Sequence, residues 1–196
     1  MVLCVDTWYG GMWASPDPAS SYKFYQALCL QAEKDPGTTY VIKFHPFRGR
    51  KRTNRTSIAF DRNELARRRT FIKRLSPPGN LRIMTVGTPL QPVLSICQLV
   101  LNIESAVAFE AMVAGVPVLH FNSKPDLEII YPRLDDFGAC YSANDVEGFA
   151  KLTGVFRSDQ ALREKLVEQQ SRYLNECHWK HQTDMISAVV DHLESA

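Results

Sequence analysis

The segment Leu99–Phe121, LVLNIESAVAFEAMVAGVPVLHF, holds the residues best placed to do chemistry. A strand ending at Ile103 and a helix starting near Ser105 would leave the first helical amides without intrahelical partners, at the positive end of the helix dipole, where phosphate binds. Glu110 lies four residues after Ala106, about 6 Å along the helix and on the same face. Its carboxylate could accept hydrogen bonds from ribose hydroxyls. The pattern fits a nucleotide site, and it also fits a capped helix packed on a sheet.

A histidine follows another apolar stretch, in the sequence Lys43-Phe44-His45-Pro46. Pro46 restricts the residue before it to extended backbone, which would hold His45 at the end of a strand. Because histidine titrates near neutral pH, His45 could donate to a phosphate or act as an acid or base. The alternative is a loop histidine with a structural hydrogen bond.

These residues need a scaffold, and the apolar runs predict one. Runs typical of strands alternate with helical segments, a pattern that favours a parallel sheet covered on both faces. We expect an α/β, Rossmann-like, mostly parallel sheet of five or six strands flanked by helices in residues 1–143, with C-terminal helices from 144–196 packing on the same domain. Strands are predicted at 2–5, 40–44, 81–86, 99–103, 116–121 and near 139–141, and helices at 20–32, 60–75, 88–97 and 106–114.

Ligands of such sheets bind beyond the carboxyl ends of the strands. The residues that follow the predicted strands are therefore candidates, namely Asp6, His45, Thr88, Glu104 and Ser105. The first strand is not followed by G-x-G-x-x-G, and G-x-x-x-x-G-K-[ST] does not occur. The common dinucleotide-binding and P-loop motifs are thus missing.

Composition narrows the classes of protein. The 196 residues are 45% hydrophobic and 22% charged, as in ordinary globular domains. The five cysteines include no C-x-x-C pair, which favours a reducing compartment without a zinc ribbon. We expect no metal and no cofactor. No signal peptide and no apolar run of about 20 residues are found, so we expect a cytoplasmic protein, or one peripheral at the inner face of the membrane.

A basic tract covers residues 48–74. It holds eleven Lys or Arg against two acidic residues, a net charge of +9, which leaves −7 for the rest of the chain. Such asymmetry favours an anionic partner, and a solvated helix face is the alternative. An anionic membrane surface or an acidic glycan is preferred over nucleic acid. The candidate contacts are Arg48, Arg50, Lys51, Arg52, Arg55, Arg67, Arg68 and Arg69.

Two elements together carry a resemblance to a known family. They are a K-x-HP element and a serine five residues before the glutamate of FEA-x-x-x-G-x-PV, formed by Lys43, His45, Pro46, Ser105, Glu110, Gly115, Pro117 and Val118. Over about residues 1–125 the chain resembles the nucleotide-sugar-binding half of GT-B glycosyltransferases. It is most similar to the capsule polysaccharide biosynthesis family that includes β-Kdo transferases. The sequence departs from that family at Asn122–Asp126, where a tyrosine and a Gly/Trp-rich run are expected, and this leaves the donor sugar open.

The resemblance implies the donor-nucleotide-binding part of a glycosyltransferase, with a CMP-sugar as the first choice and no metal. The nucleotide would contact Lys43, His45, Pro46, Thr88, Ser105, Ala106 and Glu110, and the predicted catalytic groups are His45 and Glu104. One alternative is a polyol-phosphate transferase with a CDP-linked donor. Another is a non-catalytic module that binds anionic lipid, glycan or nucleic acid through residues 48–74.

The resemblance also implies a partner domain. A GT-B enzyme has two such domains, and the N-terminal one holds the acceptor. We therefore expect this chain to need an N-terminal acceptor domain, in the same native chain or in another, and to transfer sugar negligibly alone.

Overall fold

The computed structural model describes residues 1–6, 18–44, 62–85, 88–103, 105–122 and 133–178. Their strands form one six-stranded sheet in the order β3-β2-β1-β4-β5-β6, with every neighbouring pair parallel. The strands are β1 Val2–Val5, β2 Tyr40–Lys43, β3 Leu81–Ile83, β4 Leu99–Asn102, β5 Val118–Phe121 and β6 Ser142–Ala143. The predicted α/β fold with a mostly parallel sheet is confirmed.

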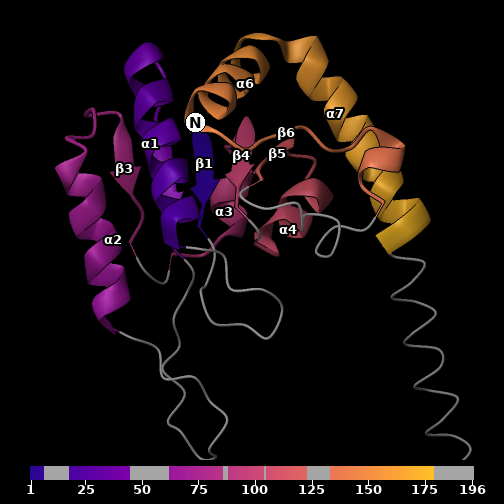
Figure 1. Ribbon diagram of the computed structural model, residues 1–196. Helices are drawn as coiled ribbons and strands as arrows, with labels where there is room; N and C mark the ends of the chain where they lie inside the picture. Colours follow the sequence, from indigo (N-terminus) through magenta and orange to yellow (C-terminus); the bar gives the residue numbers. More distant parts are fainter. Residues whose placement is uncertain (7–17, 45–61, 86–87, 104, 123–132, 179–196) are drawn as a thin grey trace, which may run out of the picture.

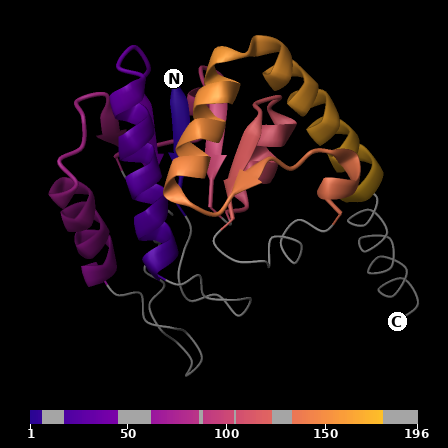
Figure 2. The same ribbon diagram turned by 45° about the horizontal axis from the view of Figure 1, so that its top comes forward.

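Helices cover both faces of this sheet (Figure 1). Figure 2 shows α1 and α6 side by side on one face, and α3 and α4 contribute to the core on the other. The bounds are α1 Pro18–Lys34, α2 Arg62–Arg74, α3 Gln91–Leu94, α4 Val107–Val113, α6 Val146–Ser158 and α7 Gln160–Tyr173, with a 3-10 turn η1 Asp135–Phe137 and a π-helical turn η2 Leu174–His178. Within the described ranges, no helix has the length and apolar character needed to cross a bilayer.

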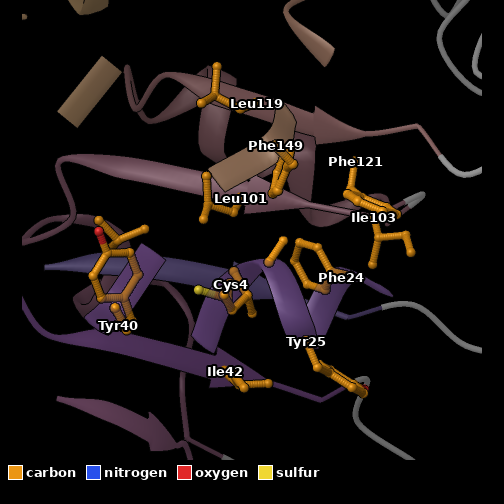
Figure 3. Close-up of a cluster of buried hydrophobic side chains, with 14 of the residues drawn as sticks. Cys4, Phe24, Tyr25, Tyr40, Ile42, Leu101, Ile103, Leu119, Phe121 and Phe149 are labelled. Carbon is orange, nitrogen blue, oxygen red and sulfur yellow. The ribbon is translucent and has the colours of Figure 1, made fainter. Parts of the chain in front are cut away.

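Two cores form because successive side chains of a strand point to opposite faces. On the α1/α6 face, Cys4 and Leu101 pack with Phe24 of α1 and Phe149 of α6 (Figure 3). The opposite core contains, among others, Leu3, Val5, Val100, Val118, Ala108, Ala111 and Met112. Strands buried on both faces explain why the sequence reads as continuous apolar runs instead of alternating ones.

The C-terminal helices pack on the sheet through a buried glutamine. Gln170 of α7 accepts the Val118 amide at 3.1 Å through Oε1, and its Nε2 donates to the Val118 and Ala139 carbonyls at 2.9 and 3.2 Å. The side chain thus supplies the bonds that a neighbouring strand would give. Asp145 and Asp159 are the N-cap residues of α6 and α7. Their carboxylates accept the Gly148 and Leu162 amides.

Helix α4, predicted at 106–114, ends at a glycine that directly follows that range. Gly115 has φ +70°, its amide bonds the Met112 carbonyl at 3.0 Å, and the Val116 amide bonds the Ala111 carbonyl at 2.9 Å. This is the Schellman arrangement, in which a glycine takes the left-handed position that other residues adopt at a cost. It turns the chain directly into β5.

Three predicted boundaries were wrong. Helix α1 begins at Pro18, two residues before the predicted start, and Ser21 inside it donates to Asp6, which follows β1. The Thr88 amide and hydroxyl both bond the Thr85 carbonyl, at 3.3 and 2.9 Å, so residue 88 closes a turn and α3 starts only at Gln91. The last strand is Ser142–Ala143 instead of 139–141, because Ala139 is bonded to the turn at Leu134.

Candidate functional site

The strand order places a switch point between β1 and β4. From β1 the chain moves outward through β2 to β3, and from β4 it moves the other way through β5 to β6. The connections therefore leave the two central strands on opposite sides and open a crevice beyond their carboxyl ends. We call this end of the sheet the carboxyl edge, and the opposite end the amino edge. Polar side chains gather at the carboxyl edge.

Asp6, directly after β1, is fully buried, and three side chains among the described residues donate to its carboxylate. The Ser21 hydroxyl donates at 3.3 Å, and the Tyr25 hydroxyl and the Arg68 guanidinium also donate to its carboxylate. Two of the donors come from α1 and one from α2, so the carboxylate ties both helices to the central strand. The sequence placed Asp6 at the rim of the crevice, and the structure corrects this: its carboxylate is committed to the core.

Arg68 is the second correction. It was predicted to contact an anionic partner, yet it is only 1% exposed and is ion-paired with Asp6. Its neighbours Arg67 and Arg69 are exposed. The buried charge is tolerated because it is paired and hydrogen-bonded. Arg68 is therefore not a surface contact of the basic tract. Its ion pair with Asp6 instead holds α2 against the residue that follows β1.

A second polar group joins the ends of β4 and β5. Asn102 and His120 are register partners and both are fully buried. The Asn102 side chain accepts the Ser105 amide at 3.3 Å through Oδ1, which turns Nδ2 towards His120 Nδ1 at 3.4 Å. Burial lowers the pKa of His120 to about 3, so the ring is neutral and Nδ1 can accept that hydrogen bond.

Sequence reasoning missed this pair. The available signal was a polar residue in an otherwise apolar strand, once in LVLN and once in VLHF. Asn102 accepts the Ser105 amide, so it helps to fix the position of Ser105 just before α4.

Ser105 and Ala106 lie at the start of α4, as predicted. Ser105 is buried, and its hydroxyl accepts the Val107 amide at 3.4 Å. Ala106 is exposed and is the residue that precedes the helix. The serine hydroxyl thus satisfies one of the first amides itself, as in a capped helix.

Lys43 and Glu110 lie on the two sides of the switch point. Lys43 ends β2, and Glu110 lies in the first turn of α4, which follows β4; the end of β1 lies between those strands. Burial lowers the pKa of the half-buried Lys43 ammonium, and the Glu110 carboxylate opposes that shift. The two charges therefore sense one another, although no hydrogen bond or ion pair within 4 Å joins them to each other.

The remaining predicted site residues divide into two groups. Thr88 is exposed, and its hydroxyl is used in the turn described above. The others lie outside the described residues, namely His45, Pro46, Glu104, Arg48, Arg50, Lys51, Arg52 and Arg55. In the described part of the chain, no group of three His, Cys, Asp or Glu side chains could hold a metal ion.

Comparison with solved structures identifies the fold. The chain is similar to the C-terminal domain of a glycosyl transferase group 1 family protein (LpcC) from Francisella tularensis, with a TM-score of 0.59, 13% identity, and coverage of 90% of this chain and 85% of that one. It is also similar to the C-terminal CMP-Kdo binding domain of WaaA from Acinetobacter baumannii, with a TM-score of 0.61, 14% identity and 88% of each chain covered.

A third similar structure is a longer enzyme, the spinosyn rhamnosyltransferase SpnG, with a TM-score of 0.58 and 20% identity. The match covers 89% of this chain and 41% of that one, so the present sequence spans about two fifths of the rhamnosyltransferase. No protein-family model matches the sequence, and no curated protein is significantly similar to it. The chain has the Rossmann-like fold of the C-terminal half of GT-B glycosyltransferases.

Proposed function

We propose that the carboxyl edge binds the nucleotide of an activated sugar and that the chain is the donor-binding part of a glycosyltransferase. The observation that carries the proposal is the position of Lys43 and Glu110 on the two sides of the switch point. A nucleotide sugar has an anionic diphosphate or monophosphate and a neutral ribose diol. A cation beside one end and a carboxylate beside the other match these two groups.

Each candidate residue has a proposed role in this arrangement. Lys43 neutralises the phosphate, and the Ala106 amide and the Ser105 hydroxyl donate hydrogen bonds to it. The Glu110 carboxylate accepts from the ribose hydroxyls. His45, Pro46 and Thr88 are proposed as further nucleotide contacts, and His45 and Glu104 as the groups nearest the reacting carbon. With a lysine, a backbone amide and a hydroxyl against the phosphate, the proposed site needs no metal.

The donor and pathway are proposed from the K-x-HP and S-x-x-x-x-E elements. A CMP-sugar used in surface or capsule polysaccharide synthesis is the first choice, and a CDP-linked polyol is the second. The similar domain of WaaA is named for CMP-Kdo binding, and a structure of SpnG contains thymidine diphosphate. Proteins with this fold therefore bind different nucleotides, and the base that this chain prefers has to be determined by binding measurements.

The acceptor is proposed to lie on a second domain. Glycosyl transfer needs the anomeric carbon and an acceptor hydroxyl held about 3–3.5 Å apart. The described carboxyl edge supplies groups for the donor, and SpnG is more than twice as long as the stretch that matches here. We expect this chain to bind the donor nucleotide, to transfer sugar negligibly alone, and to gain activity when it is joined to an acceptor domain.

Titration calorimetry with CMP, CDP and UDP tests the site. Loss of a hydrogen bond to a charged group costs about 1.5–3 kcal/mol, so Glu110→Ala should weaken binding of the preferred nucleotide roughly 10- to 150-fold. The matched control is Glu33→Ala, because Glu33 is also an exposed helical glutamate but lies at the end of α1 near the amino edge. Its removal should leave affinity unchanged. Equal affinities for wild type and Glu110→Ala would remove Glu110 from the site, and no binding of any nucleotide would refute the proposed function.

A further inference from the structure

A groove lies between α1 and the outer helix α2. It has a volume of about 510 Å³ and is lined by Tyr22, Ala66, Arg67, Thr70, Phe71 and Arg74. It has an apolar, aromatic part, because the Tyr22 and Phe71 rings stack with centroids 4.2 Å apart and planes 26° apart. Both rings are half-buried, so part of each remains accessible from the groove.

The wall of this groove is cationic. Arg67 and Arg74 are both exposed and are seven residues apart, which places them on one side of α2 about 10 Å apart along its axis. The stretch from Ala66 to Arg74 contains five basic residues and no acidic one. One of the five, Arg68, is used in the buried pair with Asp6. The other four are exposed, so every charged side chain on the surface of this stretch is a cation.

We propose that this groove binds an acidic polysaccharide, with the guanidinium groups of Arg67 and Arg74 on sugar carboxylates and a sugar ring against the Tyr22–Phe71 pair. Guanidinium groups bind carboxylates through two parallel hydrogen bonds, which suits an anionic unit held in a fixed orientation. A sugar ring has an apolar face of C–H groups, and the aromatic pair offers an apolar floor of matching character. The spacing of the two arginines allows contact with two acidic units of one chain.

The same residues fit other anionic partners less well. A helix that lies on a membrane presents bulky apolar side chains beside its cations. The large apolar residues exposed in the described part of the chain are Ile96, Val113 and Val155, all outside α1 and α2. Binding to duplex nucleic acid commonly neutralises roughly six to ten phosphates, more than the four exposed cations of this stretch supply. The proposal is independent of nucleotide binding at the carboxyl edge.

The test compares two double variants of equal charge change. Arg67→Gln/Arg74→Gln removes the groove cations, and Arg69→Gln/Lys73→Gln removes two exposed cations of the same helix that do not line the groove. Binding of a galacturonic acid oligosaccharide is measured by calorimetry at about 0.15 M salt, where diffuse surface attraction is largely screened. Thermal melting of both variants checks that α2 is still folded.

We expect the groove variant to bind the oligosaccharide at least about 10-fold more weakly than wild type, because charge-assisted hydrogen bonds are lost. The control variant should change affinity less than about 3-fold, since it alters only screened charge. A neutral oligosaccharide of equal length should not bind. Equal losses in the two variants, absence of oligogalacturonate binding, or tighter binding to phosphatidylglycerol vesicles or single-stranded DNA would overturn the proposal.

Discussion

Polar side chains that are buried or half-buried lie at both ends of the sheet, but they differ in how far their charges are buried. At the amino edge, the Asn80 amide donates to the carbonyls of Ala32, Asp35 and Thr38 at 3.0, 3.0 and 2.9 Å and so satisfies backbone groups where α1 turns into β2. The Asp35 carboxylate there accepts the Tyr40 hydroxyl at 3.2 Å and is paired with Arg157 at 3.3 Å, and both members of this ion pair keep part of their side chains exposed.

At the carboxyl edge the bonds between side chains include an ion pair that is fully buried. Asp6 and Arg68 must both be taken out of water, a cost that apolar residues of the same size would avoid. Asn102 and His120 add a second buried polar group beside it. The difference indicates that the amino edge is built to connect elements, whereas the carboxyl edge is built to hold chosen groups in fixed positions.

The largest effect is expected from the buried ion pair. Arg68→Met should lower the free energy of unfolding by about 3–5 kcal/mol, because it leaves the Asp6 charge buried with one fewer partner. Urea unfolding followed by circular dichroism measures this. Arg69→Met, an exposed arginine on the next position of α2, should change stability by no more than about 0.5 kcal/mol.

Equal losses of stability in the two variants would contradict the conclusion that the buried Arg68–Asp6 pair stabilises the fold more than an exposed arginine of α2 does. A second variant sharpens the result. Adding Asp6→Asn to Arg68→Met removes the stranded charge and should recover part of the lost stability.

The sequence predicted the layers of this fold well because the apolar runs and Gly115 act locally. It could not separate Arg68 from Arg67 and Arg69, since the three are identical in type and the burial of one depends on Asp6, which is 62 residues away in the chain. Lys43 and Glu110 were found from short motifs. Their position on opposite sides of the switch point needed the strand order, which no local pattern encodes.

A smaller, pH-dependent effect is expected from His120. Its pKa is about 3 in the folded chain and about 6.5 when unfolded, so between these values only the unfolded chain binds the proton. The free energy of unfolding should therefore fall as the pH is lowered below about 6.5, by up to roughly 1.4 kcal/mol per pH unit from this residue.

The measurement is the slope of stability against pH between pH 4.5 and 6.5 for wild type and His120→Gln. The variant lacks the titrating group and should show the shallower slope, even if its stability at pH 7 is also lower. Parallel slopes would mean that His120 binds a proton as readily in the folded chain as in the unfolded one, and that the Asn102–His120 pair does not keep the ring neutral.

We propose that the nucleotide binds at the carboxyl edge and not at the amino edge. The most direct measurement is an amide NMR titration of the ¹⁵N-labelled chain with CMP, with CDP and UDP in parallel. We predict progressive, saturable changes in amide chemical shift at the ends of β1, β2 and β4 and at the start of α4, around Lys43, Ser105 and Glu110. The signals of Asn80 and its neighbours should not change. Shifts confined to the amino edge, or no saturable shifts with any of the three nucleotides, would contradict it.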